Sequence, residues 1–582
     1  MTCEEMIQSQ EYTEILIDPA ALQEFGGILE EDTCYHSINS QVGVLYVEQK
    51  RVPPIQITDS DYAYFPKVYG LMMEGIQMEN PLMEQQTEGL PFLFDPLSLI
   101  EAGILTAQNP PLNLTGKGVI IGVIDTGIDY QNPVFQTEDG RSRIQGIWDQ
   151  TITGGNVPEG FLYGSEYTNV QIQEALEKEN PEEWVPSRDE IGHGTMVTSV
   201  AAGSRLENGR RYIGAAPDSQ IAVVKLKQAK SNQRRYYHVE KDVPCYMESD
   251  VLQGIQYLQK FAVEYKKPLV IYIGVGTNLG SHGGTGILSD YIRNLSLLKS
   301  RVFVIGGGNE GNANHHYEGT YEEGVQTKKI EFRVAEGETG FVMELWGEVP
   351  YEFSIVIRSP GGESVRPVFR NTTQSQTYSF VFERTRITID YLLIEASSGM
   401  ELIRLAFDAP TEGIWIMEVT KESIMKGGTI HGWLPIKPFL QEDTYFLTAQ
   451  PKVTLVEPGN TENAITVSAY QAESNGFSIT SSRGYTITNK RKPDLAAPGV
   501  QVSTIYGKQS GSSLAAAMTA GGVAQFLQWA VIEQNDLFVD SRKVKNYFIR
   551  GATRERDLEY PNEEWGYGTL NVAGVFRWIA GF

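Results

Sequence analysis

Unbroken apolar runs separate more polar stretches over much of this chain, and they predict buried strands. The runs Gly118–Ile124 and Arg301–Ile305 are followed by polar or glycine-rich turns, a pattern typical of strands covered on both faces. Residues Leu252–Tyr265 form a predicted helix that ends before a Lys-Lys-Pro sequence. A further strand is expected at Ala464–Ala469. Strands and helices of this kind are typical of α/β domains.

Residues 321–457 have a different pattern. Short segments alternate between apolar and polar residues, and Gly and Pro punctuate them. This alternation predicts an antiparallel sandwich, and we expect a jelly roll. The insertion either braces the rest of the chain or binds a substrate or partner. Its predicted strands include Ile330–Val334, Phe353–Arg358, Ile387–Ile389 and Ile414–Val419.

The first 90 residues predict a small α+β module. Strands are expected at Tyr12–Ile17 and Val42–Val47, with a short helix at Pro19–Phe25 between them. The chain therefore divides into residues 1–90, 91–320, 321–457 and 458–582, of which the second and fourth parts form one domain.

Asp125 is a candidate catalytic carboxylate. It directly follows the apolar run Gly118–Ile124 and precedes Thr126-Gly127. The carboxyl end of a parallel strand is where open α/β sheets place their functional groups. An Asp that caps the following helix would fit the same local sequence.

His193 is a candidate general base. Gly192 and Gly194 flank it, and a mostly apolar stretch, Met196–Ala202, follows. The glycines allow backbone and substrate to approach the imidazole, and a helix after it would hold the ring in place. A lone His at a helix start is more often structural, but the Gly-His-Gly-Thr sequence favours a catalytic role.

Ser513 is a candidate nucleophile at the start of a helix of small residues, Leu514–Gly522. A serine in this position gains from the helix dipole and the free N–H groups. A capping role is commoner for such a serine. Ser512 and Ser510 compete with it on local grounds.

Asn309 lies on a glycine-rich turn, Gly306–Gly311, that follows the strand Arg301–Ile305. Its amide can donate a hydrogen bond to a tetrahedral oxyanion. The alternative is an Asn chosen for left-handed turn geometry. Together with an acid, a base and a serine in the order Asp…His…Ser, it predicts nucleophilic catalysis.

These motifs resemble those of the subtilisin-like serine proteases, or subtilases, from about Leu99 to the C-terminus apart from the insertion. The resemblance implies that Asp125 orients His193, that His193 is the general base, and that Ser513 is the nucleophile. Asn309 and the Ser513 N–H would form the oxyanion hole. The chain departs from the family at Ser512, Leu514 and Ala517, where Thr, Met and Pro are usual. Further matching segments are Gly214–Pro217, Val223–Lys225, Lys492–Gly499 and Gly566–Gly568.

The resemblance also implies a substrate-binding strand, Val270–Gly276, in which Gly274 and Gly276 would leave room for substrate side chains. Residues 1–90 would be a prodomain that assists folding and then occupies the cleft, and a fixed accessory domain is the alternative. Autocleavage is expected between Met83 and Gly103, with Glu84–Thr87 as a candidate site. The chemistry requires no cofactor. Structural calcium is common in the family but is not indicated by any carboxylate-rich loop.

A narrower resemblance, to the clostridial Csp germination proteases, is carried by Trp148–Gln150, Asn309–Tyr317 and the insertion. It implies a protease that activates the zymogen of a cortex-degrading hydrolase and keeps its cleaved prodomain bound. Some such relatives have lost triad residues, so a pseudoprotease that binds a partner or senses germinants is one alternative. A general intracellular subtilisin is the other.

Composition excludes several classes of partner. The formal net charge is −25, which argues against nucleic acid or an anionic membrane. The chain has no stretch of about 18 apolar residues, so no membrane span is expected. The acidic start, Met1–Met6, is unlike a signal peptide. We therefore expect synthesis in the mother-cell cytoplasm and packaging in the spore, in the cortex or coat region.

The cysteines, one pair of adjacent histidines and one basic run give three further expectations. Cys3, Cys34 and Cys245 are too scattered to indicate a disulfide framework or a zinc site, so free thiols are the default. His315-His316 is not expected to bind metal, because adjacent side chains on a loop diverge. The basic run Lys225–Arg235 is expected to be a loop facing the substrate or, more commonly, solvent.

Overall fold

The computed structural model describes the chain except residues 24–32, 52–62, 74–93, 207–211, 366–374 and 582. Its centre is a nine-stranded sheet in the order β25-β24-β13-β11-β6-β9-β7-β8, with β26 paired to β24. All pairs are parallel except those that β8 and β25 make at the two edges. The strands are β6 (Ile120–Asp125), β7 (Ile144–Asp149), β8 (Ser165–Thr168), β9 (Gln220–Lys225), β11 (Leu269–Ile273), β13 (Arg301–Gly306), β24 (Ile465–Gln471), β25 (Gly476–Phe477) and β26 (Leu495–Val500).

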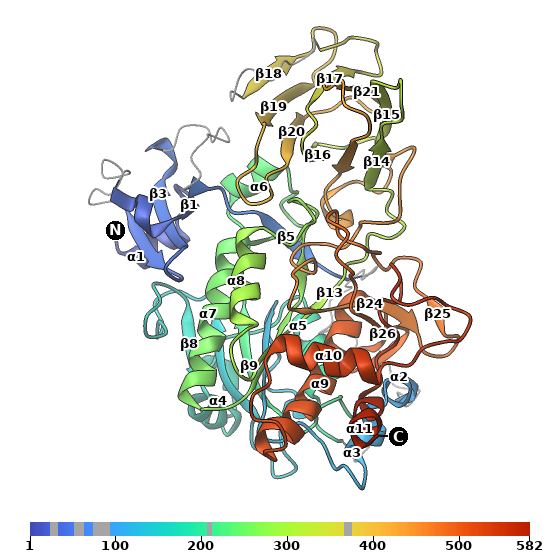
Figure 1. The fold of residues 1–582 in the computed structure, drawn as a ribbon. Helices are drawn as coiled ribbons and strands as arrows, with labels where there is room; N and C mark the ends of the chain where they lie inside the picture. The colour runs from blue at the N-terminus through green and yellow to red at the C-terminus, as the bar shows by residue number, and fades with distance from the viewer. Residues whose placement is uncertain (24–32, 52–62, 74–93, 207–211, 366–374, 582) are drawn as a thin grey trace, which may run out of the picture.

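Helices cover both faces of this sheet (Figure 1). Successive residues of β6 point to opposite sides: Ile121 packs in one core with α5 and α9, and Ile120 packs in another with α7 and α8. The predicted mostly parallel α/β sheet is thus confirmed. The helices are α2 (Leu97–Glu101), α3 (Ile104–Gln108), α4 (Asn169–Leu176), α5 (His193–Ala202), α6 (Ser231–Tyr237), α7 (Glu248–Glu264), α8 (Ile287–Leu295), α9 (Ser512–Leu527), α10 (Ser541–Gly551) and α11 (Val572–Ala580).

The N-terminal module lies beside α7 and α8 (Figure 1). Its sheet has the order β2-β3-β1-β4, and its buried side chains share a core with α7. The predicted strand Tyr12–Ile17 is β1, whereas the predicted helix is a short 3-10 turn, Pro19–Gln23, before residues outside the described part. The other elements are α1 (Cys3–Gln8), β2 (Cys34–Ser37), β3 (Gly43–Glu48), β4 (Ala63–Tyr64) and β5 (Val68–Leu71).

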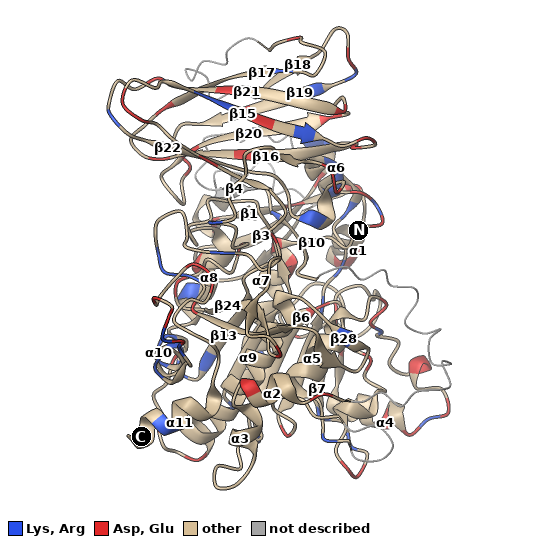
Figure 2. Cartoon of the chain, turned by 90° about the vertical axis from the view of Figure 1, so that its right-hand side faces the viewer, with Lys and Arg blue, Asp and Glu red and all other residues tan. Residues whose placement is uncertain are grey.

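The insertion is a sandwich of two antiparallel sheets, ordered β14-β22-β16-β20-β19-β18 and β17-β21-β15-β23, which confirms an inserted β-rich part. Figure 2 shows it stacked beyond the α/β domain, with Lys, Arg, Asp and Glu scattered over both. Its strands are β14 (His316–Thr320), β15 (Thr327–Val334), β16 (Gly340–Gly347), β17 (Phe353–Arg358), β18 (Gln376–Ser379), β19 (Arg386–Leu392), β20 (Glu401–Asp408), β21 (Gly413–Lys421), β22 (Thr429–Trp433) and β23 (Tyr445–Phe446).

The expectation of free thiols is wrong for two of the three cysteines. Cys3 and Cys34 form a disulfide across 31 residues, whereas Cys245 is buried and free. The pair is joined because α1 packs on β2 and β3, a proximity that spacing along the chain does not reveal.

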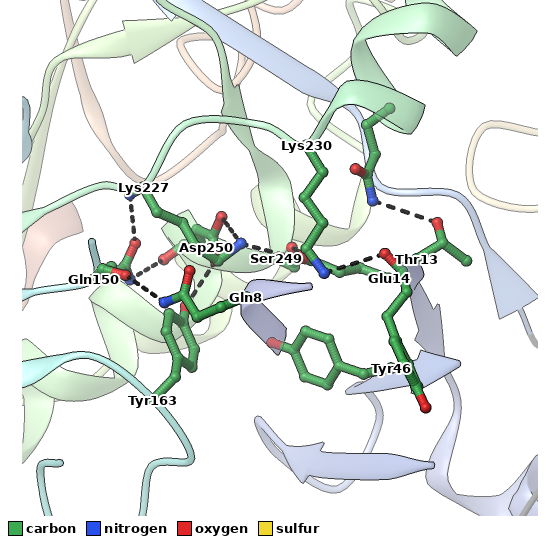
Figure 3. Close-up of polar contacts among 12 residues, drawn as sticks. Gln8, Thr13, Glu14, Tyr46, Gln150, Tyr163, Lys227, Lys230, Ser249 and Asp250 are labelled. Atoms are coloured by element: carbon green, nitrogen blue, oxygen red, sulfur yellow. Dashed lines mark hydrogen bonds and ion pairs between the residues drawn. The ribbon is translucent and has the colours of Figure 1, made fainter. Parts of the chain in front are cut away.

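The expectation that the basic run Lys225–Arg235 is a loop facing the substrate or solvent is wrong for its lysines. Lys227 and Lys230 are 5% and 4% exposed, and part of the run forms α6. Lys227 Nζ donates to Glu14 of the N-terminal module and to Asp250 of α7 (Figure 3). These lysines therefore lie at the contact between the module and the α/β domain.

A stack of buried rings joins the sandwich to the α/β domain. Trp433 of β22 stacks on His282, with ring centroids 4.1 Å apart, and His316 Nε2 lies 3.0 Å from His431 Nδ1. Burial, together with repulsion from His282 when that ring is protonated, lowers the pKa of His431 to about 4, and burial lowers the pKa of His316 well below its ordinary value. Both rings are therefore neutral near pH 7.

We expect the sandwich to lose stability as the pH falls from about 6.5 to about 4. The pKa of His431 is depressed in the folded state, so the unfolded chain takes up the proton more readily and acid favours unfolding. Over this pH range, the free energy of unfolding of His431→Gln should fall by up to about 3 kcal/mol less than that of wild type. Urea unfolding at pH 7.5 and pH 4.5 measures the difference, and equal losses in the two proteins would contradict it.

Candidate active site

Asp125 and His193 lie together at the carboxyl end of the sheet. Asp125 ends β6 and His193 begins α5. His193 Nδ1 is 2.7 Å from Asp125 Oδ1 and 2.9 Å from Oδ2, and both residues are fully buried. The carboxylate thus fixes the tautomer and orientation of the imidazole and leaves Nε2 for a reacting proton.

Asp189, which the sequence analysis missed, holds these two residues in place. Its Oδ1 accepts from the Gly192 N–H and the Thr126 hydroxyl, each at 2.7 Å. Its Oδ2 accepts from the Thr195 N–H at 2.8 Å and the Thr195 hydroxyl at 2.7 Å. A carboxylate just before a predicted helix start was the available signal. Asp189 is a positioning residue that ties the turn after β6 to the start of α5.

Ser513 is in the first turn of α9, after Gly511. The Asn309 side chain lies beside this turn: its Oδ1 accepts from the Ser512 N–H at 3.0 Å, which leaves its Nδ2 as the donor available to an oxyanion. Asn309 Nδ2, Ser513 Oγ and His193 Nε2 are buried without a hydrogen-bond partner among the described residues. Buried polar atoms are rarely left unpaired, and these three are the atoms that acyl transfer would use.

The structure places the competing serines in other roles. The Ser512 hydroxyl accepts from the Gly308 N–H at 3.1 Å, and the Ser510 hydroxyl accepts from the Gln501 N–H at 3.1 Å. Both hydroxyls are engaged by backbone, whereas Ser513 Oγ is not. The geometry therefore favours Ser513.

The predicted strand Val270–Gly276 is divided at Gly274. The first part, β11, belongs to the large sheet, and β12 (Val275–Gly276) pairs with β5 instead. A Cβ on Gly274 would lie 1.7 Å from Asp125 Oδ2. This glycine therefore makes room for the carboxylate, whereas the sequence analysis expected room for a substrate side chain. A Cβ on Gly276 would lie closest to Val456 Cγ2, at 2.5 Å, and 3.2 Å from Met72 Sδ.

The chain's own segment Val68–Met72 occupies the cleft. Its strand β5 lies between β10 (Tyr246–Met247) and β12, antiparallel to both. The register pairs Gly70 with Gly276, and the Met72 N–H donates to the Gly274 carbonyl at 3.4 Å. An extended peptide is thus held by strand addition on both sides.

The Met72 carbonyl lies near the side chains of Ser513 and Asn309. A Cβ built on Gly511 would lie 3.3 Å from both Met72 O and Ser513 Oγ, and 3.7 Å from Asn309 Nδ2. These three atoms therefore lie around the same glycine, and in the structure the Asn309 amide does not yet donate to the Met72 carbonyl. The expected cleavage candidate Glu84–Thr87 lies outside the described residues.

Two other expectations concern metals and membranes. His315 Nδ1 is 2.9 Å from Glu310 Oε2, while His316 faces His431, so the adjacent histidines diverge. In the described part of the chain, no group of three or more His, Cys, Asp or Glu side chains is arranged to hold a metal ion. Among the same residues, Ser512–Ile532 is the one segment apolar and long enough to span a membrane, and it is mostly buried in the core around Ser513.

Comparison with known proteins identifies the family. The model of the subtilase family (peptidase S8) matches residues 116–331 and 443–568, more than half of the chain. The Clostridium perfringens CspB protease superposes with a TM-score of 0.74 and 30% identity, covering 83% of this chain and 97% of that one. The Arabidopsis thaliana subtilisin-like proteases SBT3.6 and SBT3.3 are 25% and 30% identical over 228 and 234 residues, 28% of each relative's length. The resemblance is thereby confirmed, and the chain belongs to the subtilase family of serine proteases.

Proposed function

We propose that this protein is a serine endopeptidase that cuts its own chain after Met72 and then a specific protein zymogen. Ser513 Oγ attacks the carbonyl carbon while His193 Nε2 takes the serine proton. The oxyanion accepts hydrogen bonds from Asn309 Nδ2 and the Ser513 N–H. His193 then protonates the leaving amine, and water hydrolyses the acyl-enzyme. No step of this chemistry needs a cofactor.

The observation that carries the proposal is the position of the Met72 carbonyl. It lies near Ser513 Oγ and Asn309 Nδ2, beside Gly511, in a segment paired as a strand with Val275–Gly276. Holding a peptide bond beside the nucleophile in this way lowers the entropic cost of attack on it. The proposed cut, Met72–Met73, precedes the window of residues 83–103 expected from the sequence.

The test compares the whole chain with its Ser513→Ala variant by denaturing gel and N-terminal sequencing. We expect wild type to yield a new N-terminus at Met73 and the variant to stay intact. Ser510→Ala is the matched control and should be cut like wild type, because in the described part of the chain that hydroxyl is hydrogen-bonded to the Gln501 backbone and not to a reacting group. An intact wild-type chain would refute the proposal, and a different new N-terminus would refute the assigned bond.

Removal of the oxyanion amide should weaken catalysis without preventing folding. We expect Asn309→Leu to lower the first-order rate of cleavage at Met72–Met73 about 100- to 1000-fold, because the developing charge loses one donor. Time courses on gels measure this rate. A rate within about threefold of wild type would exclude Asn309 from the oxyanion hole.

For the physiological substrate we propose the zymogen of a cortex-degrading hydrolase, in the cortex or coat region of a spore. Support comes from the similarity to the CspB protease over 97% of that chain and from the Csp-like segments of the sequence. We also propose that the cleaved N-terminal module stays docked on α7, where its buried side chains share a core. A panel of unfolded proteins tests the specificity: broad digestion would favour a general subtilisin, and binding without any cleavage a pseudoprotease.

A further inference from the structure

A segment between β22 and β23 of the insertion packs on the docked strand β5. After β22 the chain returns through Ile436–Phe439, which we call the connector. Ile436 and Phe439 are 4% and 6% exposed and belong to one apolar cluster with Val68 and Met72. The strand in the cleft is therefore enclosed by the connector as well as by its two neighbouring strands.

The connector crowds the space beside Gly70, the third residue before the proposed cut. A Cβ on Gly70 would lie 2.6 Å from Ile436 Cδ1 and 3.1 Å from Phe439 Cε1. Gly70 is in a paired strand and does not have a positive φ, so other residues could adopt its backbone conformation. The glycine is thus needed for space and not for backbone conformation.

The connector is fixed to the oxyanion turn, so it cannot easily move aside. Glu310, next to Asn309, accepts from the Lys437 N–H at 3.0 Å through Oε1, while its Oε2 lies 2.9 Å from His315 Nδ1. Lys437 Nζ also donates to Asn312 Oδ1 at 2.7 Å. Glu310 is itself 4% exposed. Displacement of the connector would therefore leave the Oε1 of a buried carboxylate without the Lys437 N–H donor, which is costly.

We propose that the connector makes the cleft selective for peptides with glycine at the third residue before the cut bond, with Ile436 and Phe439 as the residues that exclude larger side chains. The inference rests on the proposed function, since it concerns the substrates of the same cleft. It gives the insertion a part in substrate selection in addition to its contacts with the α/β domain.

The cleavage test varies Gly70 in the whole chain. Relative to wild type, the rate of cleavage after Met72 should fall about 10-fold in Gly70→Ala and about 100-fold or more in Gly70→Leu, because overpacking rises with side-chain size. Adding Ile436→Ala to Gly70→Leu should recover at least about 10-fold by removing the obstructing atoms. Ile355→Ala, which removes a side chain from the sandwich core instead, is the matched control. It should not restore cleavage of Gly70→Leu.

A second readout does not depend on activity. In the Ser513→Ala background, hydrogen exchange of the Val68–Met72 amides reports docking, and Gly70→Leu should lose protection that Ile436→Ala restores. An uncut wild-type chain would refute the proposed function, while this exchange measurement would still decide the inference. Equal cleavage of Gly70→Leu and wild type, or equal protection in the two, would overturn the selectivity and leave the protease assignment intact.

Discussion

Replacement of His193 by alanine is expected to lower the rate of cleavage at Met72–Met73 about a millionfold, which makes it undetectable on gels. The loss is this large because Ser513 is a weak nucleophile until a base takes its proton, and His193 Nε2 is the atom left free for that proton. A fluorophosphonate probe that reacts with activated serines should also fail to label the variant.

The neighbouring carboxylate should matter less than the base. Asp125→Asn keeps the ring near its place but favours the wrong tautomer, and we expect about a 10⁴-fold loss. His431→Gln, which alters a buried histidine of the sandwich, is the control and should be cut at the wild-type rate near pH 7. If His193→Ala cleaved at a tenth of the wild-type rate, the proposed mechanism would be wrong.

The parts of this site that are encoded in short stretches of sequence could be predicted. The apolar run before Asp125 and the small residues after Ser513 each indicate one local element, and the structure places them at a strand end and a helix start. The α/β fold followed from the same runs together with the resemblance to subtilases. Local sequence was sufficient here because each of these groups is positioned by its own strand or helix.

The features that depend on tertiary contacts could not be predicted. The Cys3–Cys34 disulfide, the burial of Lys227 and the docking of Met72 each join segments far apart in the chain. Gly274 was read as an aid to substrate binding, but the neighbouring strand brings Asp125 against it. A single sequence contains no signal for such pairings, because hydrophobic periodicity reports burial and not the identity of the neighbour.

The largest stability effect is expected at the ion network between the N-terminal module and the α/β domain (Figure 3). Lys227 Nζ donates to Glu14 Oε1 at 2.8 Å and to Asp250 Oδ2 at 2.7 Å, with side-chain exposures of 6%, 0% and 0%. The other oxygen of Glu14 accepts from the Ser249 hydroxyl, and Asp250 Oδ1 accepts from the Tyr163 hydroxyl at 2.7 Å. Lys227 is thus shared by two fully buried carboxylates from the two parts.

The charges of this network depend on one another. Burial alone would lower the pKa of Lys227, but Asp250 and Glu14 raise it above its ordinary value. Burial would raise the pKa of Glu14, yet Lys227 and Lys230 hold it below its ordinary value. Burial lowers the pKa of Lys230 to about 8. Removal of the Lys227 charge therefore leaves two carboxylates without their shared cation.

We expect Lys227→Met to weaken docking of the module by about 3–5 kcal/mol, because one side of a buried ion group is removed. That cost corresponds to about two to four orders of magnitude in the docking equilibrium. In the Ser513→Ala background it should appear as faster hydrogen exchange of β1. In the cleaved protein it should appear as separation of the module on gel filtration.

Two variants decide whether the weaker docking of Lys227→Met comes from the carboxylates of Glu14 and Asp250 left without their cation. Adding Glu14→Gln to Lys227→Met should recover part of the loss, because one of the two unpaired charges is then gone. Lys230→Met should cost less than Lys227→Met, since among the described residues Lys230 Nζ donates to the Tyr12 carbonyl and to no carboxylate. If Lys227→Met and Lys230→Met weakened docking equally, and Glu14→Gln gave no recovery, the module would be held by its apolar core and not by the ion network.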